Sequence, residues 1–68
     1  MTMRIGHDWE VHRKGSPDKI TFERECDARV FIEGGLARMG LEYEVSYPKG
    51  VETYVASSGV CLWMEMAQ

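Results

Sequence analysis

Strict alternation of apolar and polar residues, repeated in several short segments, constrains the fold of this chain more than any other sequence feature. The clearest example is LEYEVSY at residues 41–47, in which Leu41, Tyr43 and Val45 alternate with polar residues. Successive side chains of a β-strand point to opposite faces of the sheet, so this pattern predicts a strand with one buried and one solvent-facing side. Similar alternation is present in residues 4–13, 19–23, 51–57 and 60–66.

Turn-forming residues separate these alternating segments. They are GSPD at 15–18, Gly40, PKG at 48–50 and SSG at 57–59. Glycine, proline, serine and aspartate are the residues that most often interrupt regular secondary structure. The SSG turn therefore predicts a hairpin between the last two alternating segments.

One segment has the period of a helix instead of a strand. Small or apolar residues recur there with the spacing of one helix face. They are Ala28, Phe31, Ile32, Gly35, Leu36 and Met39. Asp27 is expected to be the N-cap, and Gly40 the residue that follows the C-cap. We predict an α+β fold in a single domain over residues 1–68, with the order β-β-α-β-β. An antiparallel sheet of about four strands packs one helix on one face.

Two adjacent glycines, Gly34 and Gly35, lie inside this helical segment. A glycine in a helix interior costs about 0.5–1 kcal/mol relative to alanine. Gly35 falls near the centre of the apolar face, which suggests that the helix approaches the sheet closely where a bulky residue such as Trp9 occupies the space. Gly34 falls on the far side, in line with Val30 and Ala37. This stripe of small residues is either an uncharged surface or a contact for a second helix or a partner protein.

The other face of the sheet is predicted to be acidic, with aromatic residues among the carboxylates. The expected contact residues are Glu10, Glu42, Glu44, Tyr54, Trp63 and Glu65. The same face is expected to include Asp8, Glu23, Glu52, Ala56 and Cys61. A solvated antiparallel face is normally polar, which is the simplest interpretation. Like charges on neighbouring strands repel, however, and tryptophan and tyrosine are enriched in binding hot spots, so a contact with a basic protein surface is the functional alternative.

Composition argues against several functional classes. The chain has 68 residues, a formal net charge of −3 and a pI of about 5.2, whereas nucleic-acid binding normally requires a basic surface. No apolar run is long enough for a membrane span, and the first residues lack the apolar stretch of a signal peptide. A cytoplasmic location is expected, in which Cys26 and Cys61 are predicted to be reduced, half-buried thiols.

The sequence contains no recognised catalytic, metal-binding or cofactor-binding motif. His7 and His12 fall on opposite faces of one predicted strand, and neither cysteine belongs to a CxxC pair, so no metal site is predicted. Glu42 and Glu44 share a face as paired catalytic carboxylates do, but so short a chain cannot enclose a deep cleft. We expect no enzyme activity and no cofactor.

In size, acidity and layout, the chain is similar to the small inhibitor proteins encoded by bacteriophages, such as those that block CRISPR–Cas complexes. That class has no diagnostic motif, so the resemblance assigns no role to any residue. It implies a non-enzymatic inhibitor that occupies a basic surface of a bacterial complex, inside the host cell.

Two other functional classes remain open. A homodimeric accessory domain would use a strand edge, or the Val30–Gly34–Ala37 stripe, to complete its core. A single-stranded nucleic-acid binder would stack bases on Trp63 and Tyr54, although the neighbouring carboxylates oppose this interpretation.

Overall fold

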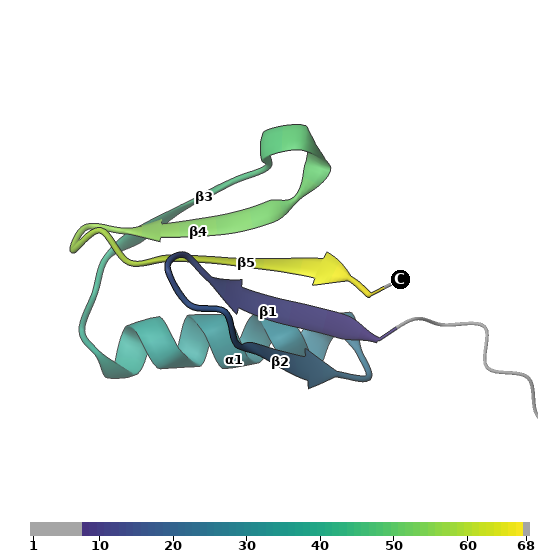
Figure 1. Ribbon diagram of the computed structural model, residues 1–68. Helices are drawn as coiled ribbons and strands as arrows, with labels where there is room; N and C mark the ends of the chain where they lie inside the picture. Colours follow the sequence, from purple (N-terminus) through teal and green to yellow (C-terminus); the bar gives the residue numbers. More distant parts are fainter. Residues whose placement is uncertain (1–7, 68) are drawn as a thin grey trace, which may run out of the picture.

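In the part of the chain that the structure describes, five strands form one antiparallel sheet, with a single α-helix against one of its faces (Figure 1). The computed structural model describes residues 8–67. The strands are β1 (Trp9–Arg13), β2 (Lys19–Phe22), β3 (Tyr43–Ser46), β4 (Glu52–Ala56) and β5 (Cys61–Met66). The helix is α1 (Glu25–Arg38), and a short 3₁₀ turn, η1 (Pro48–Gly50), joins β3 to β4. The expected α+β class is confirmed, with five strands where about four were expected.

The strand order is β2-β1-β5-β4-β3. Neighbours in the sequence form the hairpins, and the pairing of β1 with β5 joins the N-terminal hairpin to the C-terminal three strands. The hairpin predicted around the SSG turn is present as β4 and β5. Of the segment predicted as a strand over 4–13, residues 9–13 form β1, and residues 4–7 lie outside the described part of the chain.

The register of the strands determines which side chains share a face. Val11 lies opposite Ile20 on one side and Met64 on the other, and Tyr54 lies opposite Leu62 and Val45. Because side chains alternate along each strand, these apolar residues line the face that α1 covers. The strand residues that alternate with these line the opposite face, which we call the outer face.

The two ends of α1 differ from each other in how they are capped. Arg24 is the N-cap and provides no side-chain cap bond, so the prediction of Asp27 as the N-cap is wrong. Asp27 lies in the first turn, where its carboxylate accepts a hydrogen bond from Arg24 Nε at 3.1 Å. At the other end Gly40 has φ +70°, and the Leu41 N–H donates to the Leu36 carbonyl at 3.0 Å. This is the glycine-terminated end that the sequence predicts.

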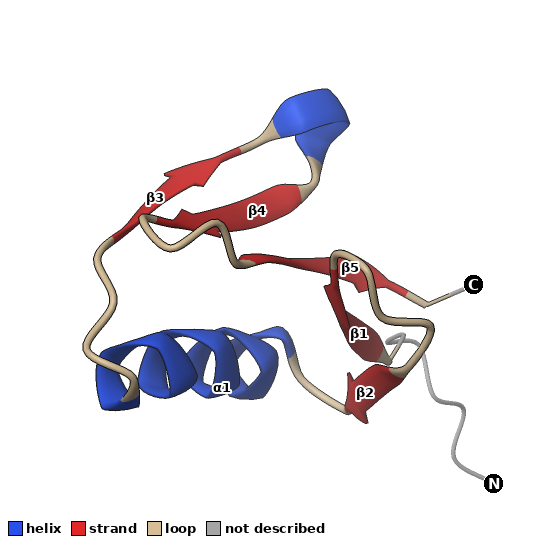
Figure 2. Ribbon diagram, turned by 60° about the vertical axis from the view of Figure 1, so that its left-hand side comes forward, coloured by secondary structure: helices blue, strands red, loops and turns tan. Residues whose placement is uncertain are grey.

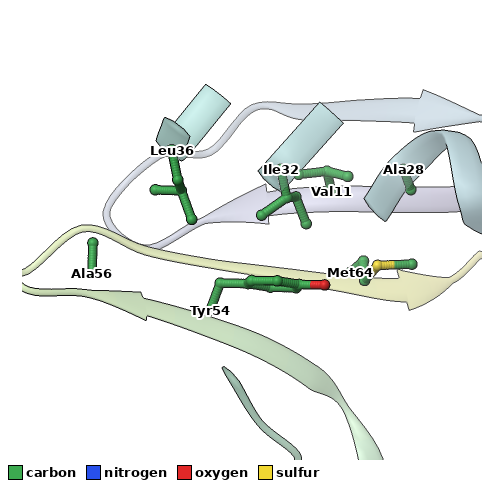
Figure 3. Packing of buried hydrophobic residues seen from close by; sticks show 7 residues of the cluster. All are labelled: Val11, Ala28, Ile32, Leu36, Tyr54, Ala56 and Met64. Atoms are coloured by element: carbon green, nitrogen blue, oxygen red, sulfur yellow. The ribbon is translucent and has the colours of Figure 1, made fainter. Parts of the chain in front are cut away.

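The core lies between α1 and the inner face of the sheet (Figure 3). Its buried residues are Val11, Ala28, Ile32, Leu36, Tyr54, Ala56 and Met64. Ile32 and Leu36 are fully buried, and burial of such a side chain contributes about 1.5–3 kcal/mol. Figure 3 shows both projecting from the helix toward the strands, with the Tyr54 ring lying beneath them.

An ion pair links the helix to β4. Arg29 donates from Nε and from Nη2 to the two carboxylate oxygens of Glu52, each at 2.9 Å, and its Nη2 also donates to Glu25 at 3.1 Å. The Tyr54 hydroxyl donates to the same Glu52 carboxylate. The hydrogen bonds from Arg29, and then from Tyr54, hold the pKa of Glu52 below its usual value against the opposing effect of burial. Glu52 therefore lies on the inner face, and its expected place on the outer face is corrected.

Candidate docking face

The outer face of the sheet is open, because α1 packs on the other side and no other described helix or strand lies over it (Figure 2). By the strand register this face combines charged, aromatic and small polar side chains with one exposed valine. They are Glu10 and His12 of β1, Lys19 and Thr21 of β2, Glu44 and Ser46 of β3, Thr53 and Val55 of β4, and Cys61, Trp63 and Glu65 of β5.

Trp63 is the largest side chain of the outer face and lies on its central strand. It is directly opposite His12 in the register, and the two rings stack with centroids 5.4 Å apart and planes within 7°. On its other side it is opposite Thr53, which is only 9% exposed. The indole is half-buried. It is therefore held by its neighbours while part of its surface remains available.

Two carboxylates flank the stacked rings. Glu10 and Glu65 lie directly opposite each other on β1 and β5. An oxygen of Glu10 is 3.1 Å from His12 Nε2, and an oxygen of Glu65 is 3.5 Å from the same nitrogen. The second oxygen of Glu10 accepts a hydrogen bond from Lys19 Nζ at 2.6 Å. This bond, and then the one with His12, holds the pKa of Glu10 below its usual value.

The structure brings together three of the six predicted contact residues: Glu10, Trp63 and Glu65. Glu44 shares the outer face but lies on the edge strand β3, where it is exposed and opposite Val55. Glu42 precedes β3 and is also exposed, and its backbone carbonyl accepts a hydrogen bond from the Ser57 N–H at 2.8 Å. The acidic character of the face is thus distributed from its centre to one edge.

Tyr54 is the predicted contact residue that the structure places elsewhere. It is 1% exposed and belongs to the core, on the inner face, so its assignment to the outer face is wrong. The same correction applies to Ala56, which is 4% exposed and lies among the core residues. The physical reason is the choice of side in β4, where an aromatic residue and an alanine share a face with Glu52. Because Glu52 is paired with Arg29, its carboxylate can lie on the inner face together with Tyr54 and Ala56.

Two residues of the face were missed as contacts. His12 shares the parity of Glu10 in β1, so the alternation alone places it on the same face. Lys19 could be placed only with the register of the β1–β2 hairpin, in which it lies opposite His12. Its ammonium group balances part of the negative charge that the sequence assigns to this face.

The predicted stripe on α1 lies on the helix surface away from the core. Val30 is 67% exposed, Ala37 is exposed and Gly34 is half-buried. A Cβ atom added at Gly34 would meet nothing within 4 Å. The position of the stripe is therefore as predicted.

Gly35 does not mark a close approach of helix and sheet, which corrects the sequence-based expectation. A Cβ atom added there would also meet nothing within 4 Å. Gly35 instead lines an apolar groove of about 300 Å³ between α1 and the β1–β2 hairpin. Partly exposed apolar side chains surround the groove, namely Ile20 (46%), Phe31 (44%) and Met39 (58%). The missing side chain keeps this groove open.

Both cysteines are free thiols, as predicted. Cys61 is half-buried on the outer face, two residues from Trp63, whereas Cys26 is exposed in the first turn of α1. The prediction of two half-buried thiols therefore holds for Cys61 only.

Comparison with known proteins assigns no family to this fold: no family model matches the chain, and no curated protein or solved structure is significantly similar to it. Within residues 8–67, no helix combines the length and the apolar character that crossing a membrane would require.

Proposed function

We propose that this chain is a non-enzymatic protein-binding module that docks through the outer face of its sheet onto a basic surface of another macromolecule. The observation that carries the proposal is the Trp63–His12 stack at the centre of an uncovered sheet face, with Glu10 and Glu65 beside it.

Each part of this arrangement supports docking. A half-buried tryptophan in a fixed orientation offers a large contact area at low entropic cost, and such residues dominate binding energies. The exposed carboxylates favour a basic partner. Glu65 has a side-chain exposure of 44%, and Glu44 is exposed on β3. Glu10, at 16%, is already paired with Lys19. Glu65, Glu44 and Glu42 therefore provide the net negative charge that would attract the partner.

The setting that we propose follows from the size and acidity of the chain. A small acidic protein that covers a basic groove can act as an inhibitor by competing with nucleic acid for that groove. A bacteriophage inhibitor of a bacterial defence complex, of the anti-CRISPR kind and acting in the host cytoplasm, is the proposed instance. In that role the chain needs neither a cofactor nor a catalytic residue.

A homodimeric accessory domain is the second candidate, and the apolar groove favours it. Ile20, Phe31 and Met39 present apolar surface beside the edge strand β2, and edge strands pair readily with other chains. The stripe of Val30, Gly34 and Ala37 offers a further apolar surface. Nucleic-acid binding is not retained as a candidate, because Tyr54, the second residue on which bases were expected to stack, is buried in the core.

Affinity capture from bacterial lysate with the tagged chain, at low and high salt, tests the proposal. We expect one multi-subunit complex that is lost at high salt. Its affinity should fall at least about tenfold for Trp63→Ala, in line with a central hot spot. Association should slow for the double variant Glu44→Lys/Glu65→Lys, and this effect should fade as salt rises.

The matched control is Glu33→Lys. It reverses the charge of one glutamate, as each of the two reversals does, but on α1, which packs against the opposite face of the sheet. Circular dichroism confirms that each variant is folded. Equal affinity of the wild type and the double variant at low salt would contradict the electrostatic part of the proposal. Recovery of the bait alone would favour the homodimer.

A further inference from the structure

We propose that Glu10, His12 and Glu65 form a binding site for a divalent transition metal, with Zn²⁺ the best match. One imidazole nitrogen and one oxygen from each carboxylate lie within 4.8 Å of one another. This set of donors belongs to two adjacent central strands, and no sequence motif indicates it. The site is a property of the isolated chain and does not depend on a protein partner.

The donor distances fit a metal centre. Zinc bonds to histidine nitrogen and carboxylate oxygen are about 2.0–2.2 Å long, so two ligands of a tetrahedral zinc are about 3.3–3.5 Å apart. His12 Nε2 lies 3.1 Å from the Glu10 oxygen and 3.5 Å from the Glu65 oxygen. The three atoms lie within 4.8 Å of one another, so side-chain rotation could bring them around one ion, provided that Nε2 is the unprotonated nitrogen of the ring. Three protein ligands leave the fourth position to water or to an incoming group.

The sheet fixes the donors in place. Glu10 and His12 are two residues apart on β1 and therefore share a face, while Glu65 lies directly opposite Glu10 on β5. The stack on Trp63 sets the plane of the imidazole independently of the carboxylates. Like charges directly opposite each other destabilise a sheet unless a cation lies between them. A metal ion at His12 Nε2 would provide that cation.

Lys19 is the competitor of the metal. Its ammonium group contacts the second oxygen of Glu10 at 2.6 Å, and the first oxygen remains directed at His12. Removal of this ammonium group should make Glu10 a better ligand. Diffuse attraction of a cation to the acidic face would also strengthen without Lys19, so the decisive effect is that of His12→Gln, which removes a donor nitrogen and no carboxylate.

Titration of the full chain with Co²⁺ and with Zn²⁺, followed by visible absorption and by calorimetry, tests the site. We expect one equivalent to bind, with the visible bands of a low-coordinate cobalt ion. The affinity should fall at least about tenfold for His12→Gln and for Glu65→Gln, the scale expected for a disturbed metal site. It should rise several-fold for Lys19→Gln. The control Glu44→Gln removes a carboxylate from the same face and should leave the affinity unchanged.

Several results would overturn the site. Equal affinity of the wild type and His12→Gln would show that the ion binds elsewhere, and an equal loss with Glu44→Gln would show diffuse attraction to the acidic face. A thiolate-to-cobalt absorption band that disappears in Cys61→Ser or Cys26→Ser would assign the ion to a cysteine. No partner protein is used, so failure here leaves the docking proposal standing, and failure of docking leaves the metal site standing.

Discussion

Among single residues, Glu52 has the interactions that most directly join the two layers of the protein. Its side chain is 12% exposed, and its carboxylate accepts hydrogen bonds from Arg29 Nε and Nη2 and from the Tyr54 hydroxyl. Arg29→Met keeps most of the side-chain volume but leaves this carboxylate without its cation. We expect a loss of about 1–3 kcal/mol in the free energy of unfolding, measured by urea denaturation at neutral pH.

The control for this substitution is Arg24→Met. The Arg24–Asp27 pair has side-chain exposures of 73% and 44%, and exposed pairs contribute about 0–1 kcal/mol. Equal losses for the two variants would show that the link between α1 and β4 has no special weight.

The same pair gives a pH dependence with a defined sign. The pKa of Glu52 is lower in the folded chain than its ordinary value of 4.5. A lowered carboxyl pKa stabilises the fold above the unfolded-state pKa, and this contribution is lost as the pH falls through the folded-state pKa. Wild-type stability should therefore decrease below about pH 4.5. In Arg29→Met the decrease should be smaller, and an unchanged pH profile would contradict the assignment.

At the scale of the elements, the glycine pair of α1 gives the next prediction. Neither Gly34 nor Gly35 meets an atom within 4 Å of an added Cβ, and neither has a positive φ. Gly35→Ala and Gly34→Ala should each raise the free energy of unfolding by about 0.5–1 kcal/mol, because alanine has the better helix propensity. A loss of stability in Gly35→Ala would restore the close-approach interpretation that the structure contradicts.

The sequence predicts the positions of the strands and the helix well. It predicts less well on which face of the sheet a given side chain lies. Alternation located the strands, because a half-buried strand such as β1 must separate Val11 from Glu10 and His12. Gly40 was predictable because only a residue that tolerates positive φ ends a helix in this way. The inward side of Tyr54 was not, since it depends on Arg29, 25 residues earlier in the chain, neutralising Glu52. The cluster around His12 required the β1–β5 register, which no local pattern contains.

At the scale of the whole molecule, the two candidate functions differ in which surface a partner covers. A homodimer would cover the groove beside β2, and a docked partner would cover the outer face. A chain of 68 residues buries only about 60% of its unfolded surface and is only marginally stable alone. If the homodimer were the functional unit, the groove beside β2 would be covered in solution, and the melting temperature would rise with protein concentration. Under the docking proposal the isolated chain is a monomer.

We therefore expect the melting temperature to be the same over about a hundredfold range of concentration, and sedimentation to give the monomer mass. Ile20→Lys places a charge at the rim of the groove, on an edge strand where lysine normally opposes pairing. It should leave the melting temperature nearly unchanged, because Ile20 is already 46% exposed. It should also leave the capture of a partner nearly unchanged, because the outer face lies on the other side of the sheet. A concentration-dependent melting temperature that Ile20→Lys abolishes would instead identify the groove as a dimer interface. The chain would then be an accessory domain, and its outer face a solvated surface.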